Sequence, residues 1–166
     1  MPQGGAVAAE LVQRLADECA DERLYRDRNQ AATATPAALP EALYDFARDA
    51  LKRLLRDKVG LRLALGEVLS EPKPLVCFSA PEQPWQPGAV TLDLRTRMLY
   101  DAEHVFVNGE AWCASGKDAR LLHELADRRA LSSEQVQRAS APVQEQLAEW
   151  QQAGWLHVWP VEAAGG

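Results

Sequence analysis

Cysteine is scarce in this sequence, and its scarcity limits the chemistry that the chain can carry. Only Cys19, Cys77 and Cys113 are present among 166 residues, and no two of them form a Cys-x-x-Cys pair. Small secreted domains use dense, even-numbered sets of cysteines as a disulfide framework. Three widely spaced thiols indicate reduced cysteines instead. We therefore expect a cytoplasmic protein without structural disulfides.

Long hydrophobic runs are also lacking. No uncharged apolar stretch approaches the roughly 20 residues that a helix needs to cross a bilayer. The first residues, from Met1 to Val12, lack the basic start of a secretory signal peptide and already include Glu10. These two features predict a protein that does not associate with membranes.

Positive charge is in deficit, most of all towards the C-terminus. The net charge is −6, and no Lys or Arg occurs from residue 139 to residue 166. A protein that binds duplex DNA needs several basic side chains on one face, and single-strand binding by aromatic stacking needs a cationic groove. Nucleic-acid binding is therefore disfavoured. Trp150, Trp155 and Trp159 are expected in a core or an interface.

Catalytic motifs are absent as well. A non-haem iron site needs His-x-Asp or His-x-Glu plus a distant His, and none of the three histidines fits that pattern. The segment from His123 to Asp127 resembles the zinc-protease motif HExxH, with Asp127 in place of the second His, but no third ligand is evident. A solvated helix flank is the favoured interpretation. Cys113 lies in a predicted strand and is expected in the core. We predict no catalytic, metal-binding or cofactor-binding residue in this chain.

The N-terminal part is predicted to be helical. Apolar spacing indicates a helix over residues 6–22, an uncharged connector over 29–39, and a second helix in which Pro40 occupies the first turn. A short third helix ends before Pro72. The second helix carries an apolar stripe, which either packs inside the subunit or pairs with another copy. The stripe consists of Leu43, Phe46, Ala47, Ala50, Leu51, Leu54 and Leu55.

The C-terminal part changes character after a proline-rich stretch. Five of the ten prolines lie between residues 72 and 87, where residues 75–78 form a short strand or a packed extended segment. Strands are predicted at 90–94, 98–100, 104–107, 110–114 and 155–159. Asn108-Gly109 predicts a hairpin turn. Three helices follow it, with capping boxes expected at Ser115 and Ser132, a start at Pro142 and a C-terminal Gly154.

These elements predict an α+β fold that is mainly helical, in which an N-terminal helical subdomain precedes a small winged-helix-like domain. We expect a helical region at 1–70, a proline-rich linker at 71–89 and the winged-helix-like domain at 90–166. Winged-helix domains commonly place their third helix in the DNA major groove. That helix, at 142–153, offers Glu145 and Glu149 but no cation, so the fold analogy and the charge disagree.

Several segments resemble one protein family in this order and spacing. The family is that of the bacterial cupin-like JmjC oxygenases, which hydroxylate an arginine of a large-subunit ribosomal protein, and the resemblance covers nearly the whole chain. The matching segments are Leu24-Tyr25-Arg26-Asp27, Leu39-Pro40-Glu41-Ala42, Leu69-Ser70-Glu71-Pro72-Lys73-Pro74, Arg97-Met98-Leu99-Tyr100, Val105-Phe106-Val107-Asn108-Gly109-Glu110 and Leu125-Ala126-Asp127-Arg128.

The resemblance implies a non-catalytic role for this chain. In that family an N-terminal barrel binds Fe(II) and 2-oxoglutarate, a helical region dimerises, and a winged-helix-like domain ends the protein. We therefore expect this chain to start after the catalytic barrel, so that both cofactors belong to a missing domain. It would serve as a dimerisation and substrate-docking module, with a basic ribosomal protein as the partner. The expected homodimer interface consists of Leu43, Phe46, Ala47, Ala50, Leu51 and Leu54.

An alternative class stays open. The chain could be a free-standing winged-helix regulator that binds nucleic acid. Such a protein would need a basic patch assembled by folding, and the candidate residues are Arg95, Arg97, Lys117, Arg120 and Arg138.

Overall fold

The computed structural model describes residues 4–18, 24–26, 35 and 37–159. The chain divides into two compact units, Met1–Leu65 and Gly66–Gly166. Within the described ranges, no helix is both long enough and apolar enough to cross a membrane.

The first unit is helical, as the apolar spacing predicts. It contains α1 (Gly4–Glu18), α2 (Glu41–Leu54) and the beginning of α3 (Lys58–Ser70). Pro40 is the N-cap of α2 and not its first helical residue, which corrects the prediction by one position. Asp57 caps α3, because its Oδ1 accepts hydrogen bonds from the backbone N–H groups of Val59 and Gly60 at 3.1 and 2.9 Å. Most of the predicted connector at 29–39, and the predicted end of the first helix at 19–22, lie outside the described residues.

The proline-rich segment belongs to the second unit. Residues 71–88 form no helix or strand, yet they pack against the domain that follows. The Phe78 ring meets Trp155 edge-on with 6.4 Å between centroids, and Trp85 packs against the core cluster. The division between the units therefore falls at residues 65 and 66, before the predicted linker at 71–89. Residues 75–78 do not form a strand, and they are not packed throughout: Leu75 is fully exposed in a turn (φ 71°) and Cys77 is exposed, while Phe78 is partly buried.

Two three-stranded antiparallel sheets build the second unit. One has the order β2-β3-β4 and the other the order β5-β1-β6, with β6 at an edge. Asn108 (φ 50°) and Gly109 (φ 94°) form the predicted turn between β3 and β4, since both central residues of a type I′ turn need positive φ. The strands are β1 (Ala89–Leu92), β2 (Met98–Tyr100), β3 (His104–Val107), β4 (Glu110–Cys113), β5 (Ala130–Leu131) and β6 (Leu156–Trp159).

Three helices complete the second unit: α4 (Gly116–Arg128), α5 (Ser133–Gln137) and α6 (Ala141–Gln152). The predicted capping box at Ser132 is confirmed. The one at Ser115 is wrong, because that side chain makes no cap bond and Asp118 accepts a 2.8 Å hydrogen bond from Ser140 Oγ instead. Gly154 (φ 76°) ends α6 as predicted, and the N–H groups of Gly154 and Trp155 reach back to the carbonyl groups of Gln151 and Trp150 at 2.8 Å each.

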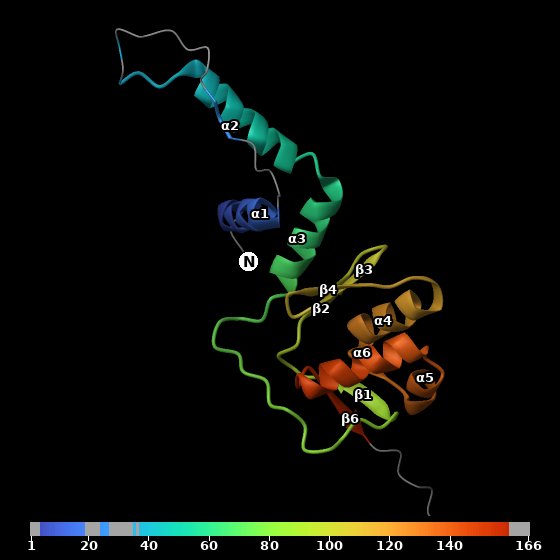
Figure 1. Ribbon diagram of the computed structural model, residues 1–166. Coiled ribbons are helices and arrows are strands. Elements are labelled where there is room, and N and C mark those ends of the chain that lie inside the picture. The colour runs from blue at the N-terminus through green and yellow to red at the C-terminus, as the bar shows by residue number, and fades with distance from the viewer. Residues whose placement is uncertain (1–3, 19–23, 27–34, 36, 160–166) are drawn as a thin grey trace, which may run out of the picture. The chain divides into compact units, whose positions relative to one another are not determined.

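The core of the second unit lies where the helices meet the strands (Figure 1). Leu122 and Leu125 of α4, together with Leu147 of α6, are fully buried, and they join Val90 of β1 and Leu156 of β6 in one cluster. The helices therefore cover the β5-β1-β6 sheet. The resulting fold is α+β and mainly helical, as predicted.

Candidate docking surfaces

The apolar face of α2 is only partly covered. No residue of α2 is buried, although the helix is strongly amphipathic. Among the six predicted interface residues, Leu43, Phe46, Ala50 and Leu54 are partly buried, while Ala47 and Leu51 are exposed. Leu51 is 51% exposed and Leu55, just past the helix, is 57% exposed.

The cover that α2 receives is incomplete. Within the first unit, Phe46 meets the Tyr25 ring with 5.7 Å between centroids. The opposite side of the helix is polar and carries ion pairs, such as Arg48 with Asp45 at 2.7 Å. Grouped apolar residues beside such a polar rim are typical of a protein–protein interface. The chemistry available on α2 is therefore apolar contact with another surface.

The exposed side of α6 is acidic. Val143, Leu147 and Trp150 point into the core, and Glu145 and Glu149 remain exposed to solvent. This is the helix that a DNA-binding winged helix would place in the major groove. Two carboxylates and no cation make its outer side repel phosphates and attract basic partners.

The five residues of the predicted basic patch do not share one surface element. Lys117 and Arg120 lie in the first turns of α4, where Arg120 Nε donates to Gly116 O at 3.3 Å. Each of the other arginines is engaged with a local acceptor. Arg95 binds the Asp93 carboxylate at 2.8 Å, Arg97 donates to Glu71 O at 3.0 Å, and Arg138 pairs with Glu134 at 2.7 Å.

Asp93 forms a polar centre that connects β1, the β1–β2 turn and β6. Its carboxylate accepts hydrogen bonds from Arg95 Nε at 2.8 Å and from the Arg95 backbone N–H at 2.8 Å, and it lies 3.0 Å from Nε2 of His157. The hydrogen bond from the Arg95 guanidinium is the main cause that holds the pKa of the Asp93 carboxyl well below its ordinary value. The charges of Asp93 and Arg95 neutralise each other within the cluster. We therefore assign the cluster a structural role.

The histidines of this chain do not fit an iron site. The His123 ring stacks on Tyr100 at 3.9 Å, and the Tyr100 hydroxyl donates to Asp127 at 3.0 Å, which raises the pKa of Tyr100. His157 contacts Asp93, and His104 Nδ1 lies 3.3 Å from Asp101. In the part of the chain that the structure describes, no three His, Cys, Asp or Glu side chains are grouped so that they could hold a metal ion. We derive no metal chemistry for these residues.

The expectation that Cys113 lies in the core needs correction, and the three tryptophans differ in their burial. Cys113 is exposed, because it ends the edge strand β4, whose outer positions face solvent. Trp159 is 60% exposed and donates a hydrogen bond from Nε1 to Thr91 Oγ1, whereas Trp150 is buried in the core as expected. Cys19 lies outside the described residues.

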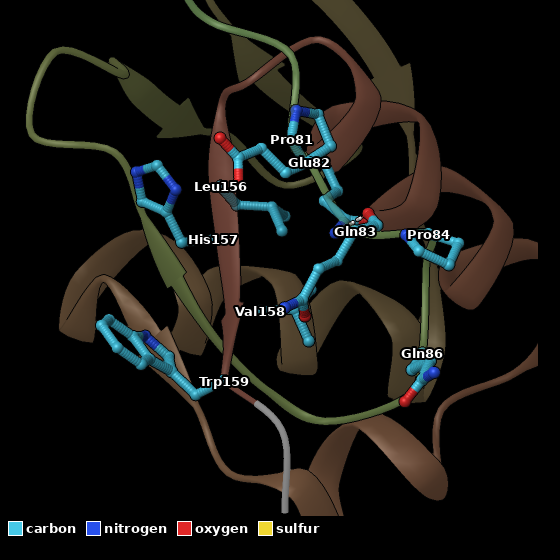
Figure 2. A pocket seen from close by; sticks show the side chains of 10 residues that line it. Pro81, Glu82, Gln83, Pro84, Gln86, Leu156, His157, Val158 and Trp159 are labelled. Atoms are coloured by element: carbon cyan, nitrogen blue, oxygen red, sulfur yellow. Dashed lines mark hydrogen bonds between the residues drawn. The ribbon is translucent and has the colours of Figure 1, made fainter.

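A groove of about 380 Å³ lies beside β6 (Figure 2). One wall is β6 itself. The other is the segment 79–88, which we call the strap. Figure 2 shows His157 and Trp159 on one side of β6 and Val158 on the side that faces Gln83 of the strap. The lining residues are Pro81, Glu82, Gln83, Pro84, Gln86, Gln151, Leu156, His157, Val158 and Trp159.

Two glycines fix the ends of the strap. A Cβ on Gly154 would lie 2.3 Å from the carbonyl oxygen of Ser79, and one on Gly88 would lie 2.4 Å from the carbonyl oxygen of Trp159. Only glycine permits approaches this close. Between these ends, Gln151 Nε2 of α6 donates to Gln83 O at 3.3 Å. The groove was not predicted from the sequence, although the prolines of the strap and the glycines at its ends were the available signal.

Comparisons with known proteins agree on one architecture. The sequence matches the family described as ROXA-like winged helix over residues 53–157. Among solved structures, Escherichia coli YcfD has a TM-score of 0.75 at 20% identity, over 95% of this chain and 45% of that one. YcfD, described as a ribosomal oxygenase in complex with cobalt and 2-oxoglutarate, gives 0.73 at 20% identity, over 95% and 46%. The chain thus spans less than half the length of these structures. No curated protein matches the sequence.

Proposed function

The chain belongs to the ROXA-like winged-helix family, and from this premise we propose that it is the assembly and docking part of a ribosomal oxygenase. The family resemblance read from the sequence is confirmed. Similarity in fold to YcfD, described as a ribosomal oxygenase, supports the proposal. In this proposal the chain is not itself an enzyme, and it works in the cytoplasm. Fe(II) and 2-oxoglutarate belong to a separate catalytic domain that this sequence does not include.

One observation carries the assembly role, namely the incompletely covered apolar face of α2. A helix with an apolar stripe gains most of its stability when a second surface covers that stripe. The first unit covers the stripe incompletely, because no α2 residue is fully buried and Leu51 is half exposed. A second copy offers the same stripe, and a two-fold axis lets the two stripes cover each other. We place the dimer interface at Leu43, Phe46, Ala47, Ala50, Leu51 and Leu54.

The docking role is supported by the charge of the second unit. From residue 66 to the end there are 8 Lys and Arg against 14 Asp and Glu. The outer side of α6 contributes Glu145 and Glu149. A field of this sign speeds the encounter with a basic protein and disfavours nucleic acid. A basic ribosomal protein is the partner that we propose.

Light scattering of the full chain at increasing concentration tests the assembly role. We expect a mass of about twice 18.3 kDa that falls towards 18.3 kDa on dilution. Leu51→Glu places a charge on the apolar stripe and should leave a monomer at all concentrations. Lys52→Glu introduces the same residue on the polar side and should keep the dimer. A constant mass near 18.3 kDa for the unmodified chain would rule out the dimer.

The docking role is tested by retention of a mixture of large-subunit ribosomal proteins on the immobilised full chain. We expect basic proteins to be retained at low salt and released as salt rises, since the attraction is electrostatic. Retention of duplex DNA in the same buffer, without retention of basic proteins, would contradict the proposal and favour the nucleic-acid regulator.

A further inference from the structure

We propose that the groove between β6 and the strap binds one cationic side chain, a lysine or an arginine, of an extended basic peptide. This inference rests on the docking role proposed above and assigns it to a specific site. The groove lies within the second unit. It brings together apolar walls, a buried acceptor that has no donor, and the carboxylate of Glu82. The apolar walls suit the aliphatic stem of such a side chain, and the acceptor and the carboxylate suit its charged end.

The strap must bow away from β6, which is why the groove exists. Its ends lie close to the two ends of the strand region: Ser79 approaches Gly154, and Gly88 approaches Trp159. The strand path between these residues spans about 17 Å, whereas the nine peptide steps from Ser79 to Gly88 can reach about 30 Å. The excess chain arches outwards. The space that it encloses is about 380 Å³, enough for a long side chain and not for a folded element.

The walls of the groove suit a methylene stem. Pro81 and Pro84 contribute apolar rings from the strap, and Leu156 and Val158 contribute aliphatic side chains from the β6 side. Lysine and arginine commonly bury their aliphatic stems along surfaces of this kind while the charged end stays among polar atoms. A short polar side chain would leave these walls uncovered.

Gln151 lines the groove, and its side chain holds a buried acceptor in the groove wall. Its side chain is 4% exposed, and its Nε2 donates to Gln83 O, which fixes the orientation of the amide. Among the residues that the structure describes, no group donates to Gln151 Oε1, although that atom is buried. A buried acceptor without a donor is unfavourable. In this proposal a small movement of the groove wall exposes Oε1, and a guanidinium or ammonium group then supplies the missing hydrogen bond.

The charges around the groove favour a cation. Glu82 is exposed at the groove, and no Lys or Arg is among the lining residues. The sequence from 74 to 94 and from 139 to 159, which builds the strap and both flanking elements, contains no Lys or Arg. Arg95, which follows the first of these stretches, is held by Asp93. An anionic peptide would meet only repulsion here.

The test is a titration of the isotopically labelled full chain, followed by NMR, with peptides of about ten Gly and Ser residues, a length that spans one strand. One peptide carries a central Arg, one a central Lys, and one a central citrulline, which has the shape of Arg without its charge. We expect the Arg or the Lys peptide to shift the resonances of Gln83, Gln151 and Val158. The citrulline peptide should bind at least about tenfold more weakly, because it cannot form charge-assisted hydrogen bonds.

Two variants locate the site. Glu82→Gln removes the carboxylate from an exposed position, and it should weaken binding of the cationic peptide severalfold without disturbing the fold. Gln151→Met removes the acceptor and should weaken binding as well. Glu110→Gln, on the exposed edge of β4, removes the same charge elsewhere and should leave binding unchanged.

Three results would overturn the inference: equal binding of the citrulline peptide, no shifts at Gln83 and Gln151, or equal effects of Glu82→Gln and Glu110→Gln. The proposed function fails separately, when the chain neither dimerises nor retains basic ribosomal proteins. If the chain binds the cationic peptide but stays monomeric, the groove proposal stands and the assembly role is contradicted. If the Glu82→Gln variant retains ribosomal proteins as strongly as the unmodified chain, the docking role stands and the groove is not its site.

Discussion

The two units of this protein bury their apolar side chains to very different extents. In the second unit, helices α4 to α6 place leucines and valines in a core where Leu122, Leu125 and Leu147 are fully buried. In the first unit, α2 has an equally clear apolar stripe and no buried residue. A periodic pattern therefore states which face of a helix is apolar, but not which surface covers it. In the second unit the cover comes from the same chain, and for α2 we propose that it comes from another copy.

The largest expected effect contrasts a leucine from each unit. Leu147→Ala should lower the free energy of unfolding of the second unit by about 2–5 kcal/mol, because a buried leucine loses its contacts and leaves a cavity. Leu51→Ala should cost less than about 1 kcal/mol at low protein concentration, since the side chain is half exposed there. Urea unfolding of both variants measures the difference. A loss at Leu51 as large as that at Leu147 in dilute monomer would show that α2 is covered within the subunit.

A pair of glycines sharpens the comparison inside the second unit. Gly154 and Gly116 both have positive φ, 76° and 60°, but only Gly154 is close to another backbone atom, Ser79 O. Gly116→Ala should cost about 1 kcal/mol from backbone strain, and Gly154→Ala about 2–3 kcal/mol because strain and a clash with the strap add together. Thermal unfolding of the two variants tests this. Equal losses of stability in the two variants would mean that the strap moves away from a Cβ at residue 154 at no cost in free energy.

The polar centre at Asp93 should make the second unit sensitive to acid. The pKa of the Asp93 carboxyl is lowered in the folded state, so the folded protein binds this proton less readily than the unfolded chain does. The stability from this group is therefore present above the unfolded value, near 3.8, and is lost as the pH falls below it. Asp93→Asn should lower the free energy of unfolding at pH 7 by about 1–3 kcal/mol and flatten this acid dependence. An unchanged acid profile in that variant would assign the sensitivity to other carboxylates.

The smallest expected effect compares two helix caps. Ser132 makes a full capping box with Gln135, whereas the Ser115 side chain makes no cap bond. Ser132→Ala should cost about 1 kcal/mol and Ser115→Ala less than about 0.5 kcal/mol. Equal costs in chemical denaturation would indicate that the Ser115 hydroxyl caps α4 in solution.

Local chemistry explains what could be predicted from the sequence. The bounds of β2 and β3 follow from short apolar runs, the β3–β4 turn from Asn108-Gly109, and the end of α6 from Gly154. Each of these signals acts between residues close together in the chain. The helical character of the first unit followed in the same way from apolar periodicity.

Tertiary contacts explain what could not be predicted. The strand β5 has two residues, too few for a periodic pattern, and it exists because β1 pairs with it. Asp118 belongs to a pattern typical of a capping box. Its carboxylate instead accepts a hydrogen bond from the hydroxyl of Ser140, 22 residues away. The groove depends on contacts between the strap and α6 across 68 residues, from Gln83 to Gln151. No local pattern contains that information.

Hydrogen–deuterium exchange of the full chain at several concentrations tests the central claim most directly, because it reads both units in one experiment. Protection of α6 reports the internal core and should not depend on concentration. Protection of α2 should rise with concentration as second copies cover its apolar face. Low protection of α2 that stays constant at every concentration, with α6 protected throughout, would contradict the account.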